Sequence, residues 1–431
     1  MRVVHVSDSI EGGAGRAALH LHQMLRNVGV DSHVVTLHPK GADTFIHHAS
    51  GYLRKIADRY MKNVDRLPNK VFRARPTGHW SNNWAPNGTL GLVLSLKPDV
   101  VHMHYIGAGA VPVRDFSRVK CPIVWTLHDM MALTGGCHYS GGCERFREAC
   151  GCCPIINSSS SNDLSSVNWR RKDAAWRNIP MTLVCPSNWM AEMARASSLM
   201  SSKSIAVIHN GVDLDCFHPI DRGSARGSLG LSRDAFLVAF GSASTSDPRK
   251  GLGSLLDALR ALHDQGTIKG LELVVFGSGG WQSAGFPIRT HNLGVIREDR
   301  LLSLIYSAAD VFCSPSHEEN LATTAIEALA CGTPVVAFHV GGFLDMIEHL
   351  GCGYLANPFE SGSLLDGLLY IHSRRLVANG LRHAARQRAK ALFDGRANAA
   401  CHLDLYQHLL DEVRRRPNHS THKSVASRYT Y

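Results

Sequence analysis

The chain has 431 residues, of which 44% are hydrophobic and 19% charged, a composition that excludes a mainly disordered protein. This length exceeds what one hydrophobic core usually organises and predicts two domains of about 200 residues each. The formal net charge of +10 predicts an anionic partner, and charge alone leaves nucleic acid, phosphorylated substrates and membrane surfaces open.

Neither a membrane-spanning helix nor a signal peptide is expected. The sequence has no run of about 18 apolar residues. Its first 19 residues enter a strand-like segment and a glycine-rich turn, without the apolar core and cleavage site of a signal peptide. These features predict a cytoplasmic protein.

Short Val-rich runs alternate with longer amphipathic segments along the whole chain. Such strands followed by helices are typical of parallel sheets covered on both faces. The first half contains predicted strands at 3–6, 34–37, 100–104, 123–127 and 182–186. The second half contains them at 236–240, 271–276, 310–314 and 334–338. Helical periodicity recurs at 14–27, 188–196, 252–264, 298–308 and 362–391.

Each half opens with a strand, a Gly/Ser-rich turn and a helix. The predicted fold class is therefore α/β, with two doubly wound, Rossmann-like parallel-sheet domains facing each other across a cleft. The join is expected near "VIHNGVDLDCFHP", because its Asn-Gly dipeptide predicts a turn and a polar stretch follows its proline. The predicted parts are a first domain at 1–206, a second at 207–394, a helix at about 395–416 that packs back on the first domain, and a disordered basic tail at 417–431.

The first candidate phosphate site is the turn "SDSIEGGAGRAAL". Gly12, Gly13 and Gly15 lie between strand 3–6 and a helix expected to begin near Ala14. Glycines let the backbone approach a ligand, and a helix N-terminus offers unpaired N–H groups to an anion. The turn is neither a full dinucleotide fingerprint nor a Walker loop. A tight strand-to-helix turn without a ligand is an equally good interpretation.

The second candidate is "FGSASTSDPRKGLGSLLDAL", in which Arg249 and Lys250 precede a helix. Two cations at that position can neutralise a diphosphate. Taken by itself, a solvated basic pair at a helix start explains the pattern at least as well.

The third candidate is "PSHEENLATTAIEALACGTPVVAF". Thr324 and Glu327 match a capping box, with Ala325 as the first helical residue and Gly332 ending the helix. Glu327 could therefore serve only as a cap. Glu319 lies outside that pattern, in a loop after a predicted strand, where ligands bind in such sheets.

Together these stretches resemble the retaining nucleotide-sugar glycosyltransferases of family 4, which have the GT-B fold. The resemblance covers most of the chain and rests on the Gly-Gly pair after the first strand, "PDVVHMH", "NGVD", "RKG" and "PSHEENLATTAIEALACGTPVV". The last stretch is similar to the family's two glutamates separated by seven residues, with its helix and G-x-P-V-V turn.

The resemblance implies a role for each charged candidate. Glu327 would accept hydrogen bonds from the ribose of the nucleotide, and Glu319 would bind hydroxyls of the donor sugar. Lys250, with Arg249, would hold the diphosphate. Since fixed cations and helix-end amides can stabilise a departing diphosphate, no metal is expected to be needed for catalysis.

The resemblance also implies backbone contacts. The N–H groups of Thr323 and Thr324 would help to hold the diphosphate, and Gly12 and Gly13 would bring the first domain's backbone against the phosphates or the acceptor.

The sequence departs from the family at two places. The family's usual "E-G-F-G" is "E-N-L-A" here, so that Asn320, expected beside the sugar, and Ala322 replace glycines. The arginine that often follows the second domain's first strand is also missing, and Arg249 is expected to compensate. These departures leave the identity of the donor open.

The stretch "WTLHDMMALTGGCHYSGGCERFREACGCCP" resembles a subgroup of the family associated with bacterial exopolysaccharide and colanic-acid-type assembly. His128 follows strand 123–127, and the resemblance implies that it lies near the donor sugar and the acceptor. A histidine with only a structural role is the alternative.

The same stretch contains a cluster of cysteines. Four of them offer thiolates, and Cys150-x-x-Cys153 has the spacing of metal ligands, whereas Cys137-x5-Cys143 is looser than most structural zinc sites. Structural zinc, free thiols and disulfides all remain open. Cys152 and His138 make the ligand set ambiguous.

Residues 52–67 place apolar side chains on one helical face and basic side chains on another. Such a stretch can lie on an anionic membrane, although an ordinary surface helix is as good an interpretation. The first option predicts peripheral association with the inner face of the cytoplasmic membrane and fits an acceptor carried on a polyprenyl diphosphate.

The resulting hypothesis is a transferase that moves a hexose from a UDP- or GDP-sugar to a saccharide acceptor in exopolysaccharide biosynthesis, with retained anomeric configuration. One alternative is a GT-B relative such as a nucleotide-sugar epimerase or a disaccharide synthase. Another is a non-catalytic subunit that binds sugar or nucleic acid. Nucleic acid is not expected as a partner, because aromatic residues make up only 7% of the chain and are not interleaved with basic ones.

Overall fold

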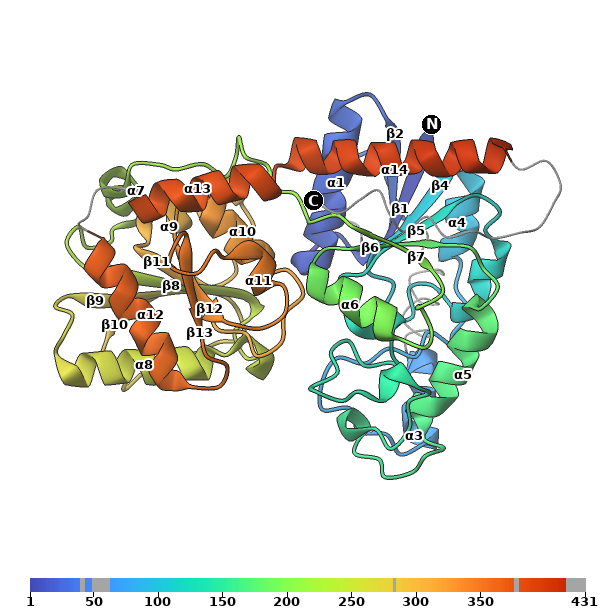
Figure 1. Ribbon diagram of the computed structural model, residues 1–431, viewed down its shortest axis with the longest axis horizontal. Coiled ribbons are helices and arrows are strands. Elements are labelled where there is room, and N and C mark those ends of the chain that lie inside the picture. Colours follow the sequence, from blue (N-terminus) through green and yellow to red (C-terminus); the bar gives the residue numbers. More distant parts are fainter. Residues whose placement is uncertain (39–42, 49–62, 282–283, 376–379, 416–431) are drawn as a thin grey trace. The chain divides into compact units, whose positions relative to one another are not determined.

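A computed structural model describes residues 1–38, 43–48, 63–281, 284–375 and 380–415 (Figure 1). The chain divides into two compact units. The N-terminal unit comprises Met1–His209 and the helical residues from Asn398 onward, and the C-terminal unit comprises Asn210–Ala397. Among the described helices, none combines the length and the apolar character that crossing a bilayer requires.

The N-terminal unit is built on a seven-stranded parallel sheet in the order β3-β2-β1-β4-β5-β6-β7. Its strands are β1 (Arg2–Ser9), β2 (Asp31–His38), β3 (Ile46–His47), β4 (Val100–Met103), β5 (Ile123–Thr126), β6 (Thr182–Cys185) and β7 (Ser204–Val207). Its α-helices are α1 (Gly12–Asn27), α3 (Leu67–Val71), α4 (Thr89–Ser95), α5 (Leu164–Trp176), α6 (Asn188–Ala196) and most of α14 (Gly395–Arg415).

The C-terminal unit is built on a six-stranded parallel sheet in the order β10-β9-β8-β11-β12-β13. Its strands are β8 (Phe236–Ser244), β9 (Leu271–Ser278), β10 (Arg289–Asn292), β11 (Val311–Ser314), β12 (Val335–Phe338) and β13 (Gly353–Ala356). Its α-helices are α7 (Arg222–Leu229), α8 (Leu252–Gln265), α9 (Asp299–Ala308), α10 (Thr323–Ala330), α11 (Phe343–Met346), α12 (Ser361–Arg374) and α13 (Gly380–Leu392).

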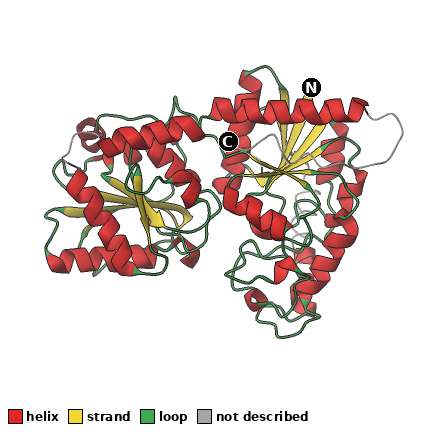
Figure 2. Ribbon diagram, viewed as in Figure 1, coloured by secondary structure: helices red, strands yellow, loops and turns green. Residues whose placement is uncertain are grey.

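Both units have the layered arrangement that the sequence predicts, and the α/β fold class with two Rossmann-like parallel sheets is confirmed. Helices cover the strands on both sides in each unit (Figure 2). The central strands β4, β5, β11 and β12 are buried along their whole length, which explains their continuous apolar runs. The order of strands reverses direction between β1 and β4 and again between β8 and β11. Ligands in such sheets bind beyond the carboxyl ends of the strands at these reversal points.

Helix α14 packs on the N-terminal sheet from the far end of the chain. Its residues Ala399, Leu405 and Tyr406 share a buried cluster with Val3 and other core residues of that unit. The hydroxyl of Tyr406 lies 2.6 Å from Nδ1 of the buried His102. The last described helix is therefore part of the N-terminal core.

Some predicted elements differ from the structure. The helix predicted at 362–391 consists of α12 and α13, with residues 376–379 between them outside the described residues. Most of the basic amphipathic segment at 52–67 and the basic tail at 417–431 also lie outside the described residues.

Candidate functional site

Lys250 and Glu319 meet at the strand reversal of the C-terminal unit. Lys250 ends a short 3-10 helix, Pro248–Lys250, in the loop that follows β8. Glu319 lies in the loop that follows β11. Because the carboxyl ends of neighbouring parallel strands lie at the same edge of a sheet, the topology brings these two loops together.

Close backbone contact holds the two loops in place. Gly251, which follows Lys250, has φ +71°, and a Cβ atom there would lie 1.9 Å from the carbonyl oxygen of Pro315. Only glycine permits this approach. The backbone N–H of His317 donates a 2.8 Å hydrogen bond to the carbonyl oxygen of Arg249. The position of Lys250 is thus fixed before any ligand binds.

Lys250 Nζ donates a 2.5 Å hydrogen bond to Oε2 of Glu319. Glu319 is 5% exposed, and its carboxylate also accepts from Ser316 Oγ at 3.4 Å and from the backbone N–H of Asn320 at 3.2 Å. Burial raises the pKa of Glu319, but the charges of Lys250 and Arg249 and the hydrogen bonds outweigh it, so that the pKa is lowered. The site therefore holds an ionised carboxylate beside a partly exposed ammonium group.

Arg249 joins the two loops. Its Nη1 donates to the carbonyl oxygen of Glu318 at 2.8 Å and lies 3.5 Å from Oε2 of Glu319. Its Nη2 also lies 3.3 Å from a carboxylate oxygen of Asp247. This guanidinium adds positive charge beside Lys250 and also braces the loop that carries Glu319.

Two glycines in the loop after β12, Gly341 and Gly342, contact the backbone of Glu319. Gly341 has φ +54°, and a Cβ atom there would lie 1.9 Å from the carbonyl oxygen of Glu319. The N–H of Gly342 donates to that same oxygen at 3.1 Å. Asn320, which follows, is 2% exposed. The residue that replaces a family glycine is therefore packed inside the unit.

Helix α10 begins just after this loop, and its first residues are Thr323 and Thr324. Both are half-buried, and the first N–H groups of a helix have no acceptor within it. The predicted capping box is wrong, because the helix begins at Thr323 rather than Ala325 and no side chain caps it. The predicted role of Gly332 is confirmed: the last helical residue is Ala330, Gly332 has φ +72°, and the N–H groups of Gly332 and Thr333 donate to the carbonyl oxygens of Leu329 and Ala328.

Glu327 lies in the interior of α10 and is 1% exposed. The hydroxyl of Tyr306, on α9, donates a 2.7 Å hydrogen bond to its Oε2. The carboxylate is thus paired with a buried phenol from the neighbouring helix, a tertiary contact that the local capping pattern does not show.

The glycine turn of the N-terminal unit follows β1 directly. Gly12 and Gly13 are exposed at the start of α1, which begins before the predicted Ala14. A Cβ atom on Gly15 would lie 2.4 Å from the carbonyl oxygen of Ser9, so this glycine is required by the close packing of the helix on the strand. Gly12 and Gly13 are the glycines that remain open to a ligand.

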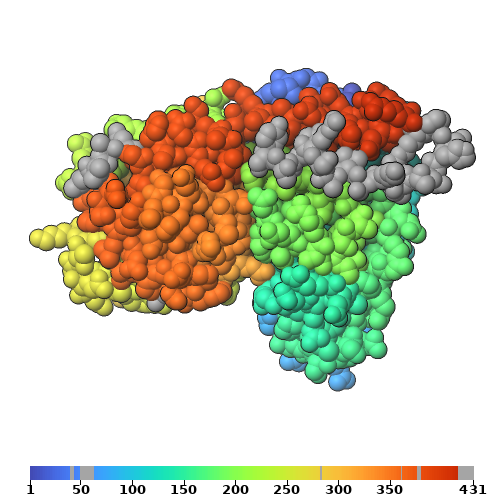
Figure 3. All heavy atoms as spheres, viewed as in Figure 1, coloured from blue at the N-terminus to red at the C-terminus, as the bar shows by residue number. Residues whose placement is uncertain are grey.

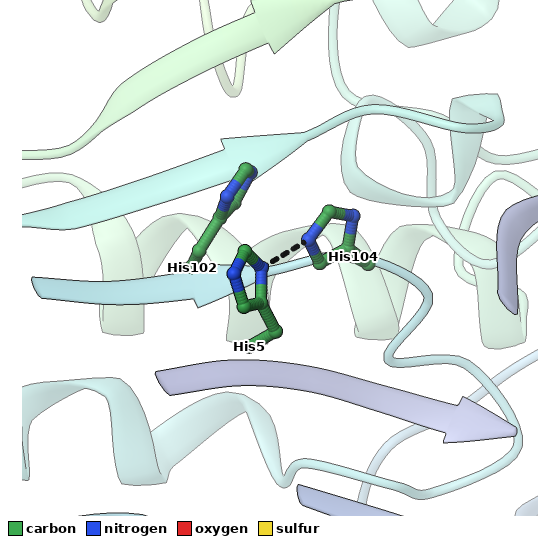
Figure 4. A group of neighbouring side chains, drawn as sticks. All are labelled: His5, His102 and His104. Atoms are coloured by element: carbon green, nitrogen blue, oxygen red, sulfur yellow. Dashed lines mark hydrogen bonds between the residues drawn. The ribbon is translucent and has the colours of Figure 1, made fainter. Parts of the chain in front are cut away.

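His128 follows β5 and belongs to a chain of imidazoles. Its Nε2 lies 3.1 Å from Nδ1 of His104, and Nε2 of His104 lies 3.0 Å from Nδ1 of His5. Figure 4 shows the inner part of this chain, where His5 on β1 faces His104 at the end of β4. The arrangement orients the His128 ring at the carboxyl edge of the sheet.

Burial keeps these imidazoles neutral. It lowers the pKa of His128 to about 4, although the neighbouring Asp129 raises it. The pKa values of His5 and His104 are also well below the ordinary value because of burial and their imidazole neighbours. His128 is therefore a neutral hydrogen-bonding group at neutral pH.

The ligand atoms of His5, His102 and His104 lie within 4.8 Å of one another, a grouping that can hold a metal ion (Figure 4). However, both ring nitrogens of His102 already have hydrogen-bond partners, the hydroxyls of Tyr406 at 2.6 Å and Thr126 at 2.7 Å. Metal binding would break these bonds, so the trio is better explained as a polar network of the core.

The predicted cysteines lie in the N-terminal unit, in the same connection after β5 that begins with His128. They surround a small cavity in the segment between β5 and α5, and they are Cys137, Cys143, Cys150 and Cys153. All of them are free thiols in the structure.

The structure thus places the predicted residues in three groups. The C-terminal unit brings together those expected to bind the donor: Arg249, Lys250, Glu319, Asn320, Thr323, Thr324 and Glu327. The N-terminal unit holds Gly12, Gly13 and His128 at the carboxyl edge of its sheet, and the cysteines elsewhere. Sequence reasoning missed Tyr306 and His104. His102 and His104 alternate in the predicted strand "VVHMH", which could have shown that they share one face of the sheet.

Two family models match the chain. Residues 11–216 match the model described as Glycosyltransferase Family 4, and residues 236–391 match that of the Glycosyl transferases group 1. A D-inositol 3-phosphate glycosyltransferase of Actinosynnema mirum is 35% identical over 300 residues, which are 66% of this chain and 66% of that protein. A protein of the same name from Mycolicibacterium vanbaalenii is 28% identical over 83% of this chain and 79% of its own length.

The relative from Saccharomonospora viridis, also named D-inositol 3-phosphate glycosyltransferase, matches over only 52% of its length. This chain therefore spans about half to two thirds of the length of the relatives from Actinosynnema mirum and Saccharomonospora viridis.

Solved structures share the fold. Sucrose-phosphate synthase of Thermosynechococcus elongatus superposes with a TM-score of 0.70 at 20% identity, covering 96% of this chain and 100% of that one. HepE of Anabaena in complex with UDP-glucose gives a TM-score of 0.62 at 18% identity, with 96% and 99% of the two chains covered. The two parallel-sheet units are thus those of the GT-B fold. The chain consists of a Glycosyltransferase Family 4 domain followed by a Glycosyl transferases group 1 domain, and both of its halves belong to glycosyltransferase families.

Proposed function

We propose that this protein is a retaining glycosyltransferase that moves a hexose from a UDP- or GDP-sugar to a saccharide acceptor. The observation that carries the proposal is the pair of Lys250 and Glu319 at the strand reversal of the group 1 domain, 2.5 Å apart. A fixed ammonium group at this edge suits the diphosphate of a donor, and an ionised carboxylate beside it suits the hydroxyls of a sugar.

In the proposed reaction, the bond between the anomeric carbon and the diphosphate oxygen breaks, and a bond from that carbon to an acceptor oxygen forms on the same face. The acceptor's proton passes to the departing diphosphate, so that the products are the glycoside and a nucleoside diphosphate. Lys250, Arg249 and the first N–H groups of α10 would stabilise the negative charge that develops on the leaving group. Neutral His128 would hydrogen-bond the sugar or the acceptor.

Two acceptor classes have support. The resemblance of residues 125–154 to an exopolysaccharide subgroup favours a saccharide carried on a lipid diphosphate, which we propose as the acceptor. The names of the relatives from Actinosynnema and Mycolicibacterium favour a phosphorylated cyclitol as the second candidate.

The first experiment identifies the nucleotide of the donor. A thermal-shift panel of UDP-, GDP- and ADP-sugars should show one nucleotide that raises the melting temperature, because a ligand of the folded state stabilises it. With that donor, we expect free nucleoside diphosphate to form only when an acceptor is supplied. Formation without an acceptor, or interconversion of the donor sugar, would instead favour a hydrolase or an epimerase. NMR of the glycoside product should show the anomeric configuration of the donor.

The lipid-linked acceptor implies a place at the inner face of the cytoplasmic membrane. We propose that the basic segment at 52–67 provides this association. Sedimentation with liposomes should then increase with the fraction of anionic lipid, and replacing Lys55, Arg59, Lys62 and Arg66 by glutamine should abolish the increase. Equal sedimentation with neutral and anionic liposomes would contradict this part of the proposal.

A further inference from the structure

A long irregular segment connects β5 to α5 in the N-terminal unit. Between residues 133 and 163 it contains no α-helix, and its regular structure is limited to two 3-10 turns, Arg145–Arg147 and Pro154–Ile156, and an isolated bridge between Trp80 and Cys137. Part of this chain region, coloured teal, is visible on the surface of the unit in Figure 3. Irregular segments of this length are uncommon in compact domains, and those that are ordered usually have a function of their own.

Apolar packing in the second half of this segment is limited. Leu133 and Phe146 belong to the main core of the unit, whereas the rest forms a separate hydrophobic cluster with three buried residues, Cys153, Ile156 and Leu164. The backbone is also unfavourable in places, since Cys150 and Cys152 have φ values of +50° and +43°, which are uncommon for residues other than glycine. A cross-link would add to the order of such a segment.

The thiols of the segment converge on one cavity. Its volume is about 20 Å³, enough for one water-sized occupant, and its lining includes Cys137, Cys143, Cys150 and Cys153. No three of these sulfur atoms lie within 4.8 Å of one another in the described structure. Thiolates arranged tetrahedrally at about 2.3 Å from zinc are about 3.8 Å apart, so binding requires the side chains to close on the ion.

The backbone around one of these sulfurs already has the form that a thiolate needs. Cys150 Sγ accepts a hydrogen bond from the backbone N–H of Gly135 at 3.2 Å. Hydrogen bonds of this kind stabilise metal-bound sulfur and orient the ligands.

A buried cation lies beside the cavity. Lys172, on α5, is 1% exposed, and its ammonium group donates to the carbonyl oxygens of Met131 at 2.5 Å and Thr134 at 2.9 Å. It forms no ion pair with any residue that the structure describes. Burial lowers its pKa to about 8, while the nearby Cys137, Cys150 and Asp129 raise it. A buried positive charge in this position calls for an anionic neighbour.

We propose a structural zinc site formed by four thiolates, those of Cys137, Cys143, Cys150 and Cys153. Binding converts four thiols and Zn²⁺ into a tetrathiolate complex of charge −2 and releases four protons to the solvent. The complex places additional negative charge beside the buried ammonium group of Lys172, and it links the first part of the irregular segment, at Cys137, to its last part, at Cys153.

The geometry also resolves which neighbours are not ligands. The ring of His138 is held at both nitrogens, by Asp129 at 2.8 Å and by Ser81 at 2.8 Å. Cys152 is directed elsewhere, because its Sγ lies 3.3 Å from the carbonyl oxygen of Ser159. Cys152 therefore serves as a matched control within the same loop.

The test is the metal content of the full chain, purified without added chelator and measured by plasma mass spectrometry. We expect one zinc per chain, released in step with the modification of four thiols by a mercurial reagent. Cys150→Ser and Cys153→Ser should lose the zinc, whereas Cys152→Ser should retain it. Absence of stoichiometric zinc, equal loss in Cys152→Ser, or disulfides among the four cysteines would overturn the proposal.

A second measurement does not depend on whether the variants fold. X-ray absorption at the zinc edge of the wild-type chain should show four sulfur neighbours at about 2.3 Å and no lighter ligand. A first shell that contains nitrogen or oxygen would overturn the tetrathiolate assignment. Neither measurement involves transferase activity, so the zinc site and the proposed function can fail separately.

Discussion

The ammonium group of Lys250 lies 2.5 Å from the carboxylate of Glu319, although 69 residues separate them in the chain. The two loops that carry them are joined by the Arg249 side chain, by a backbone hydrogen bond to His317 and by the contact that Gly251 permits. A positive charge that is already in place loses little free energy to reorganisation when a diphosphate departs.

Replacing Lys250 by alanine should mainly slow turnover. The ammonium group is expected to act most strongly on the charge of the leaving diphosphate, so kcat should fall by about 100-fold or more, with a smaller change in donor KM. Steady-state kinetics with saturating acceptor would measure this. Arg260→Ala, which removes an exposed cation from α8, is the matched control and should leave kcat unchanged. Equal kinetics in both variants would remove Lys250 from the reaction.

Replacing Glu327 should mainly weaken nucleotide binding. Its carboxylate is buried and accepts a hydrogen bond from Tyr306, so it offers a rigid acceptor to a ribose hydroxyl. We expect Glu327→Ala to raise the Kd for the nucleoside diphosphate by about 10-fold, as measured by calorimetry. Glu360→Ala, at an exposed position before α12, should bind as the wild type does.

The Tyr306→Phe variant measures how much the hydrogen bond between Tyr306 and Glu327 contributes to folding, while it leaves the Glu327 carboxylate available for binding. The variant removes one hydrogen bond to a buried carboxylate, and the free energy of unfolding should fall by about 1–3 kcal/mol. Urea denaturation would measure the loss. A variant as stable as the wild type would show that the hydrogen bond between Tyr306 and Glu327 contributes little to folding.

His104 should act as a positioning residue for His128. The His104→Phe variant keeps a ring in the core but removes the nitrogen that lies 3.1 Å from His128 Nε2. If His128 must be held in one orientation, kcat should fall by about 10-fold while donor KM stays the same. His104→Asn, whose amide can still hydrogen-bond, should recover part of the rate. A purely structural role would instead lower the melting temperature of both variants without this pattern in the kinetics.

The N-terminal unit should lose stability in mildly acidic solution. Burial lowers the pKa of several of its histidines below the ordinary value of about 6.5; they are His5, His22, His102, His104, His128 and His402. The stability of the folded unit is therefore greatest above pH 6.5, where these histidines are neutral in both states. Below pH 6.5 the unfolded chain binds protons that the folded unit does not. The free energy of unfolding then falls by about 1.4 kcal/mol for each such histidine and each pH unit.

Tryptophan fluorescence can follow this loss of stability. Of the 7 tryptophans in the chain, all but Trp281 lie in the N-terminal unit. The urea midpoint reported by fluorescence should therefore drop steeply between about pH 6.5 and pH 5. A midpoint that stays constant over this range would show that the cluster is protonated in the folded state. The variant His402→Phe should make the dependence on pH shallower, because one titrating group is removed.

The alternation of strands and helices could be predicted because the central strands are buried on both faces and appear as continuous apolar runs. The strands that escaped prediction are those with exposed or polar positions: β3, β7, β10 and β13. All four lie at sheet edges, where a strand has only one neighbouring strand. Hydrophobic pattern alone does not identify such strands.

The candidate site could be predicted only in part. Spacing along the sequence drew attention to Glu319 and Glu327, but it does not show that Lys250 pairs with Glu319, because that contact depends on which strands are neighbours. The pattern of a capping box also placed Glu327 at a helix end, whereas tertiary packing gives it Tyr306 as a partner. The chain of His5, His104 and His128 arises in the same way, from strand β1 and from the residues that follow β4 and β5.

The return of α14 to the first sheet has a consequence for biosynthesis. The C-terminal unit is one continuous stretch of chain, so it can complete its folding as soon as its last helix leaves the ribosome. The N-terminal unit emerges first but finishes last, because its His102 must await Tyr406, 304 positions later in translation. During that interval the nascent sheet exposes an apolar surface, which makes it a natural client for chaperones.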